Sequence, residues 1–144
     1  MISGYRISIN KAEFDIDAIH AYLSQSYWSP DIPKETLERA IAHSLCFAVF
    51  NESNEQVGFA RMITDTATFA YLADVYILEA HRNKGLSKWL MQSVADHPDL
   101  QGLRRIILAT RDAHGLYKQF GFKPLANPTT FMELWAPEVY SQLK

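Results

Sequence analysis

Apolar and polar positions alternate with two different periods along the chain, and these periods separate strands from helices. Residues 5–10 alternate apolar and polar, which is the two-residue period of a half-buried strand. Residues 15–23 instead space Ile16, Ile19 and Leu23 by three and four positions, which places them on one face of a helix. The same helical pattern predicts three further helices, over residues 34–43, 86–96 and 113–120.

Runs of β-branched and aromatic residues between turn residues predict the rest of a sheet. The predicted strands cover residues 45–50, 56–63, 69–78, 105–110 and 131–135. Gly121 directly follows the last predicted helix and is a candidate left-handed C-cap. The order of these elements predicts an α+β (mixed α/β) domain, in which about four helices flank one central, mostly antiparallel sheet.

Composition limits the class of protein. The 144 residues contain no Gly/Ser-rich or Pro-rich linker, so we expect a single domain over residues 1–144. The net charge of -2 creates no overall field that would attract nucleic acid or an anionic membrane, so neither is an expected partner. The single cysteine, Cys46, cannot form an internal disulfide, and no apolar stretch approaches the roughly 18 residues of a membrane span. We therefore expect a cytoplasmic protein.

A predicted strand, a basic turn and a helix N-terminus follow one another over residues 72–87. The first turn of a helix has unpaired backbone N–H groups and a positive dipole end, which together suit a phosphate. Arg82 and Lys84 add positive charge, and Gly85 lets a ligand approach the backbone without a Cβ in the way. Ser87 can donate a hydroxyl hydrogen bond in the same turn. Taken alone, the segment is explained equally well as a solvated basic loop that caps the helix.

A second segment, residues 116–122, follows after one more predicted strand and has the sequence LYKQFGF. Together the two segments resemble the Gcn5-related N-acetyltransferase (GNAT) superfamily, whose patterns are (Arg/Gln)-x-x-Gly-x-(Gly/Ala) opening a helix and, later, Leu-Tyr-x-x-x-Gly-Phe. Arg82, Gly85 and Ser87 match the first pattern, with Ser87 where Gly or Ala is usual. The second pattern is matched in full, and the predicted order of elements agrees with the family.

The resemblance implies an N-acetyltransferase that moves acetyl from acetyl-CoA to a primary amine by direct attack in a ternary complex. Tyr117 corresponds to the tyrosine whose hydroxyl lies near the thioester sulfur, so it is the expected general acid. Thr110 stands where many members have asparagine, so that side of the site must be built differently. The expected cofactor-binding residues are Val75, Tyr76, Ile77, Arg82, Asn83, Lys84, Gly85, Leu86, Ser87, Thr110, Asp112, His114 and Tyr117.

The base and the acceptor site are less constrained. Asp74 lies in the middle of a predicted strand, where a buried unpaired carboxylate would be costly. Pairing with a nearby arginine or lysine explains it, and so does a role as the catalytic base. The family usually builds its acceptor wall from the loop after the first helix. The expected substrate residues are Tyr27, Trp28, Arg61, Tyr71 and Phe131, each of which also suits an ordinary core or surface position.

Two functional classes remain open. The first is an active enzyme whose acceptor is a small-molecule or peptide amine; the second is a non-catalytic acyl-CoA-binding sensor or regulatory module. The retained Tyr117 favours the enzyme. No histidine or cysteine spacing indicates a metal, so acetyl-CoA is the only expected cofactor. Dimers are common in the family, which makes a homodimer one candidate assembly.

Overall fold

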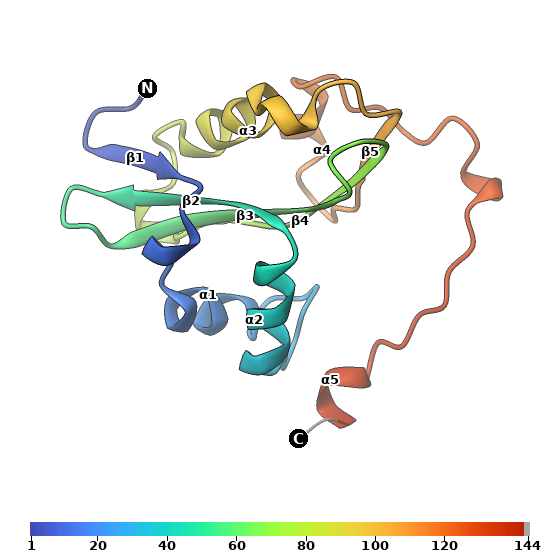
Figure 1. Ribbon diagram of the computed structural model, residues 1–144, viewed down its shortest axis with the longest axis horizontal. Coiled ribbons are helices and arrows are strands. Elements are labelled where there is room, and N and C mark those ends of the chain that lie inside the picture. Colours follow the sequence, from blue (N-terminus) through green and yellow to red (C-terminus); the bar gives the residue numbers. More distant parts are fainter. Residues whose placement is uncertain (143–144) are drawn as a thin grey trace.

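Five strands form one sheet in the order in which they follow one another along the chain (Figure 1). The computed structural model describes residues 1–142. The strands are β1 (Tyr5–Ser8), β2 (Leu45–Asn51), β3 (Gln56–Thr64), β4 (Phe69–Ile77) and β5 (Arg105–Leu108). Strands β1 to β4 pair antiparallel, whereas β5 runs parallel to β4. The predicted mixed architecture with a mostly antiparallel sheet is confirmed.

Helices cover both faces of this sheet. They are α1 (Ile16–Leu23), α2 (Lys34–Ala42), α3 (Leu86–Asp96), α4 (His114–Lys118) and the four-residue α5 (Val139–Gln142). In Figure 1, α3 and α4 lie above the sheet and α1 and α2 below it. None of the helices in residues 1–142 is long and apolar enough to span a membrane.

The two-residue period of β2 supplies two separate cores. Phe47 and Val49 pack in the core beneath α3, while Ala48 and Phe50 pack in the core against α1 and α2. Because successive strand residues point to opposite faces, a strand covered on both sides is apolar throughout. This explains the uninterrupted apolar sequence of this central strand.

Asp74 interrupts the alternation of β4. Before it, Leu72 packs on the α3 side; after it, Val75 and Ile77 pack on the α3 side and Tyr76 on the α1 side. The side-chain alternation is therefore offset by one residue, and the register with β3 shifts at the same place. Asp74 has a left-handed backbone, with φ 57°. These features define a β-bulge, which re-aims side chains and bends the strand.

Strand β5 pairs with only the first half of β4. Phe69 to Leu72 pair with Arg105 to Leu108, and no strand within residues 1–142 continues the pairing beside residues 73–77. The two parallel strands therefore part directly before the bulge. The backbone of β4 beyond Leu72 is left with an open edge on this side.

The predicted strand over residues 131–135 is wrong. After α4 the chain forms a C-terminal arm, residues 123–142, which is irregular apart from the short turn η4 (Pro128–Thr130) and α5. Figure 1 shows this arm, in orange to red, swinging away from the body before it returns at α5. The strand pattern fails here because a strand also needs a neighbour to pair with, and local sequence does not determine the neighbour.

Candidate active site

The N-terminus of α3 is an open, basic turn. Asn83 and Gly85 both have left-handed backbones, with φ 63° and 84°. The helix has no side-chain cap at Gly85 and no acidic residue in its first turn. Residues 82–85 are exposed, whereas Leu86 is buried and fixes the helix to the core. The free N–H groups and the positive end of the helix dipole therefore face solvent, as an anion site requires.

Space over Gly85 is open as well. A Cβ built on this residue would approach only the Cδ1 atom of Ile2, at 3.5 Å. Packing inside the chain therefore tolerates a side chain, and the requirement for glycine comes from the left-handed φ and from whatever approaches the turn. A coenzyme A phosphate fits this arrangement of uncapped N–H groups and positive charge.

The Arg82 guanidinium makes two hydrogen bonds to groups outside this turn. Its Nε donates to the Ile77 carbonyl at 2.9 Å, and its Nη2 donates to the Tyr22 hydroxyl at 3.2 Å. The Tyr22 ring in turn stacks on Tyr76, with ring centroids 3.9 Å apart. Two of the three guanidinium nitrogens thus join the end of β4 to α1. Sequence reasoning missed this role of Tyr22, since nothing local distinguishes it from other helix residues.

Tyr117 lies on α4 and is almost fully buried, with 8% of its surface exposed. Burial, and after it the nearby Tyr27 and Asp112, raise the pKa of its hydroxyl to about 12. The hydroxyl therefore keeps its proton at neutral pH. Gly121 has φ 90° and ends the helix, which confirms the predicted left-handed C-cap. The reversal brings Phe122 edge-on against the Tyr117 ring, at 5.9 Å between centroids.

Asp74 is held by two donors. Its Oδ2 accepts from Nε of Arg61 at 2.7 Å, and its Oδ1 accepts from Nε1 of Trp28 at 2.9 Å. Arg61 also donates to the Ser44 hydroxyl at 3.2 Å, and that hydroxyl donates to the Ala40 carbonyl at 2.6 Å. The pairing explanation for this carboxylate is confirmed by the Arg61 ion pair. The network connects the bulge of β4 to the end of α2.

The loop between α1 and α2 reaches both sides of the parted strands. Trp28 bonds to Asp74 on β4, as described above. The Tyr27 hydroxyl accepts from the Arg111 backbone N–H at 3.1 Å, just after β5. The Arg111 guanidinium lies over the Tyr27 ring, 3.8 Å from its centroid. This loop therefore bridges the opening between β4 and β5, and Arg111 is a contact that sequence reasoning missed although it named both neighbours.

Three other expected residues, Thr110, Tyr71 and Phe131, make contacts of their own outside this network. The Thr110 hydroxyl accepts from the Ala113 N–H at 3.1 Å and shapes the turn before α4. Tyr71 belongs to the half of β4 that still pairs with β5, opposite Ile107. Phe131 lies in the C-terminal arm, where its ring centroid is 5.1 Å from the Arg105 guanidinium. The contacts made by Phe131 thus place it beside β5 rather than beside Asp74.

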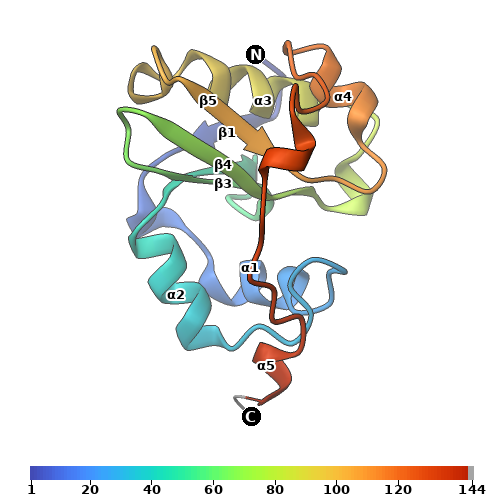
Figure 2. The ribbon, with the colours of Figure 1, turned by 90° about the vertical axis from the view of Figure 1, so that its right-hand side faces the viewer.

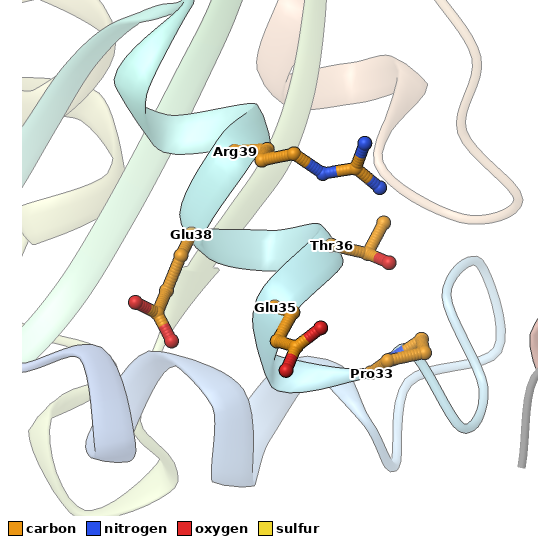
Figure 3. Close-up of a pocket in the computed structure, with 5 residues that line it drawn as sticks. All are labelled: Pro33, Glu35, Thr36, Glu38 and Arg39. Atoms are coloured by element: carbon orange, nitrogen blue, oxygen red, sulfur yellow. The ribbon is translucent and has the colours of Figure 1, made fainter.

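A shallow hollow on α2 is separate from this site (Figure 3). It is lined by residues of that helix and the proline before it, namely Pro33, Glu35, Thr36, Glu38 and Arg39. Arg39 and Thr36 extend to one side of the helix and Glu38 to the other. None of the expected site residues lines this hollow, so it adds nothing to the chemistry of the parted strands.

The sequence pattern of the acetyltransferase (GNAT) family matches residues 12–122, a range that includes both the basic turn and Tyr117. The chain belongs to this family. A Gibberella zeae protein named as a candidate acetyltransferase is 37% identical, over 83% of this acetyltransferase and 79% of that protein. The open turn and the parted strands thus belong to an acyltransferase.

Solved structures agree with this assignment. A chain from Xanthomonas campestris pv. campestris, described as a candidate acetyltransferase of the same family, is 51% identical with a TM-score of 0.94. The match covers 98% of this acetyltransferase and 99% of that chain, so it extends into the C-terminal arm. A GNAT family acetyltransferase from Elizabethkingia anophelis, solved with acetyl-CoA bound, is 14% identical with a TM-score of 0.64 and shares the fold over 93% of this chain and 90% of its own.

Proposed function

We propose that this acetyltransferase moves an acetyl group from acetyl-CoA to a primary amine of a small molecule or peptide, by direct attack in a ternary complex. The proposal rests on three separate features of the structure. These are the uncapped N-terminus of α3, the open edge of β4 beyond Leu72 and the protonated Tyr117. Acetyl-CoA supplies the thioester whose C–S bond breaks as the amine nitrogen bonds to the carbonyl carbon.

The pyrophosphate lies, in this proposal, on the backbone N–H groups from Asn83 to Ser87. Lys84 is exposed beside them and adds positive charge, as does the third nitrogen of Arg82. The extended part of the coenzyme pairs with the open edge of β4 at Val75, Tyr76 and Ile77. Backbone N–H groups of the same edge stabilise the oxyanion, which is worth about 3–4 kcal/mol per donor in other acyl transfers.

Tyr117 acts on the leaving group. A thiol has a pKa near about 8.5, whereas burial raises the pKa of Tyr117 to about 12. Complete proton transfer from this tyrosine to the thiolate is therefore uphill, and its main contribution is a hydrogen bond to the developing negative charge. The thiolate is already a fair leaving group, so loss of Tyr117 slows turnover without abolishing it.

Asp74 serves, in the same proposal, as a positioning residue. Both of its carboxylate oxygens accept hydrogen bonds from Arg61 and Trp28, and its left-handed backbone forms the bulge. By fixing the Asp74 side chain, these two hydrogen bonds also fix the edge of β4, which orients the thioester carbonyl. The amine proton then passes to water. In the alternative, Asp74 accepts this proton as the base, and substitution of Asp74 distinguishes the two roles.

Calorimetric titration with acetyl-CoA tests the binding half of the proposal. Gly85→Glu places a negative side chain in the basic turn and should abolish binding. Gly102→Glu is the matched control, because Gly102 is also a left-handed glycine, with φ 75° and no atom within 4 Å of its would-be Cβ. Equal affinity in the wild type and in Gly85→Glu would contradict the proposed phosphate site.

Turnover tests the catalytic half. Release of free thiol is followed with a panel of primary amines, for the wild type and for Tyr117→Phe. We expect turnover to fall about 10- to 100-fold in the variant, which is at or below the lower end of the range for general-acid catalysis. The affinity for acetyl-CoA should change little. Binding of acetyl-CoA without transfer to any amine would instead support the non-catalytic sensor.

A further inference from the structure

Arg111 presents a positively charged side chain with a fixed plane beside the parted strands. Its guanidinium carbon lies 3.8 Å from the centroid of the Tyr27 ring, and its backbone N–H donates to the Tyr27 hydroxyl at 3.1 Å. The residue is therefore held through both its main chain and its side chain. Stacking on the ring occupies one face of the guanidinium but none of its N–H groups, because these lie in the plane of the group.

The N–H groups of this guanidinium are available to a ligand. Among residues 1–142, none of the ion pairs or side-chain hydrogen bonds includes the Arg111 side chain. Arg61, by contrast, donates to Asp74 and to the Ser44 hydroxyl. Asp112 follows Arg111 in the chain and is exposed, so solvent screens its charge. Within the described part of the chain, Arg111 thus keeps its full set of donors and its charge unpaired.

The loop that holds Arg111 also contacts the rest of the proposed site. The Tyr27 and Trp28 rings meet edge-on, with centroids 5.1 Å apart, and Trp28 donates to Asp74 at the bulge of β4. Burial and then Tyr27 raise the pKa of the Tyr117 hydroxyl, so Tyr27 lies close to that residue. Figure 2 shows this loop, in light blue, and α4 on the same side of the molecule. Arg111 is thereby fixed near both the open strand edge and the leaving-group side.

We propose that Arg111 selects an acceptor that carries an anionic oxygen group, a carboxylate or a phosphate, in addition to its primary amine. This inference rests on the proposed function, because it concerns the amine that attacks acetyl-CoA. A guanidinium can bind either group through two parallel N–H···O bonds, and such charge-assisted bonds are about twice as strong as neutral ones. Since the Tyr27 ring already fixes the guanidinium plane, binding costs less side-chain freedom.

The surroundings of Arg111 suit the rest of such an acceptor. Tyr27 and Trp28 leave 45% and 38% of their surfaces exposed, so the carbon skeleton between the amine and the anion has aromatic rings to contact. The buried Asp74 carboxylate does not repel the anion, because its charge is paired with Arg61. The net charge of the chain is -2, so the attraction for an anion is local to this arginine.

Matched pairs of amines test the proposal in the thiol-release assay. β-Alanine is compared with β-alaninamide, and phosphoethanolamine with ethanolamine, so that the members of each pair differ in the anionic group. The wild type should prefer an anionic member by at least about tenfold in kcat/KM, the size of a hydrogen bond to a charged group. The difference should lie mainly in KM, because the anion does not touch the reacting atoms. The pair that shows the preference distinguishes a carboxylate from a phosphate.

Substitutions of the arginine show whether the preference comes from it. Arg111→Met removes the donors but keeps an unbranched apolar side chain against Tyr27, and it should abolish the preference. Arg111→Lys keeps the charge and should retain part of it. Arg104→Met is the matched control, because Arg104 is exposed directly before β5, at the opposite end of that strand from Arg111. A purely structural role of Arg111 would instead slow both members of each pair alike.

Calorimetric binding of the same amines to the complex with coenzyme A separates this inference from the proposed function. If no amine is acetylated, the proposed function fails, and the anion site is judged by binding alone. The anionic member should then bind more tightly than the neutral one in the wild type but not in Arg111→Met, and equal binding overturns the inference. Turnover with equal kcat/KM within every pair also overturns it and leaves the proposed function intact. So does a preference for the anion that persists in Arg111→Met.

Discussion

Asp74→Asn separates a structural role of this carboxylate from a catalytic one. Asparagine tolerates the left-handed φ of 57° and still offers one oxygen to the neighbouring donors, so the bulge should persist. What is lost is the charge that pairs with Arg61. The side chains of Asp74 and Arg61 are 3% and 15% exposed, and the joining atoms lie 2.7 Å apart.

The magnitude follows from this burial. Removing one partner of a buried ion pair costs about 3–5 kcal/mol in free energy of unfolding. Because the amide keeps a hydrogen bond to a charged donor, we expect the lower loss of about 1.5–3 kcal/mol. Asp74→Ala keeps the Cβ at this left-handed position but removes the polar group that makes the conformation tolerable, which adds up to about 1–2 kcal/mol.

Urea unfolding measures the first effect and steady-state kinetics the second. A double-mutant cycle with Arg61→Gln should recover a coupling of about 0.5–3 kcal/mol between the two side chains. If Asp74 only positions the strand edge, kcat of Asp74→Asn at saturating substrates falls less than about tenfold. A fall of 10²–10⁴-fold with the fold intact is the signature of a lost base, and it would refute the positioning role. An unchanged free energy of unfolding would refute the importance of the ion pair.

Three further predictions concern other parts of the fold. The fold raises the pKa of Tyr117 to about 12, so it favours the neutral hydroxyl. The stability that this preference contributes is complete below the unfolded pKa near about 10, and it is lost as pH rises through about 12. Accordingly, pH profiles of kcat for the wild type and Tyr117→Phe should show no decline below about pH 10 that depends on this residue, and a decline near pH 8–9 removed by the substitution would contradict it. Gly58→Ala should lower the free energy of unfolding by about 1–3 kcal/mol, because its Cβ would lie 2.6 Å from Cδ1 of Ile77 and 3.2 Å from the Tyr76 carbonyl; chemical unfolding should show partial rescue by Ile77→Val, which removes the closest atom. Hydrogen bonds from the Thr68 side chain, and then from backbone N–H groups, hold the pKa of Asp65 well below its usual range. The stability that this carboxylate contributes is therefore present above its unfolded pKa and lost as pH falls through its folded pKa. Asp65→Ala should lower the melting temperature at neutral pH, and the difference from the wild type should shrink in strong acid.

Sequence predicted the local structure well where local physics decides it. The three-and-four spacing of Ile16, Ile19 and Leu23 is a property of one helix, and α1 forms where that spacing occurs. Gly121 has the predicted left-handed φ, because only the backbone around it determines whether a Cβ is tolerated. The family, too, was identified from short motifs whose residues act within a few positions of one another.

The tertiary structure decided which distant groups meet. The sequence marked Asp74 as unusual, but only folding brings Arg61 and Trp28 to its two oxygens and places the bulge there. Arg82 carries the charge that the motif requires, yet tertiary contacts direct two of its nitrogens to Ile77 and Tyr22. These contacts join segments far apart in the chain, so no local period encodes them.

Strand pairing shows the same limit most clearly. Residues 131–135 have the composition of a strand, but a strand is completed by hydrogen bonds to a neighbour. Within residues 1–142, this segment pairs with no strand of the sheet. Likewise, the parting of β4 and β5 after Leu72 depends on the length of β5 and on the course of the chain after it. Local propensity therefore determined what each segment can form, and non-local contacts determined where the site opens.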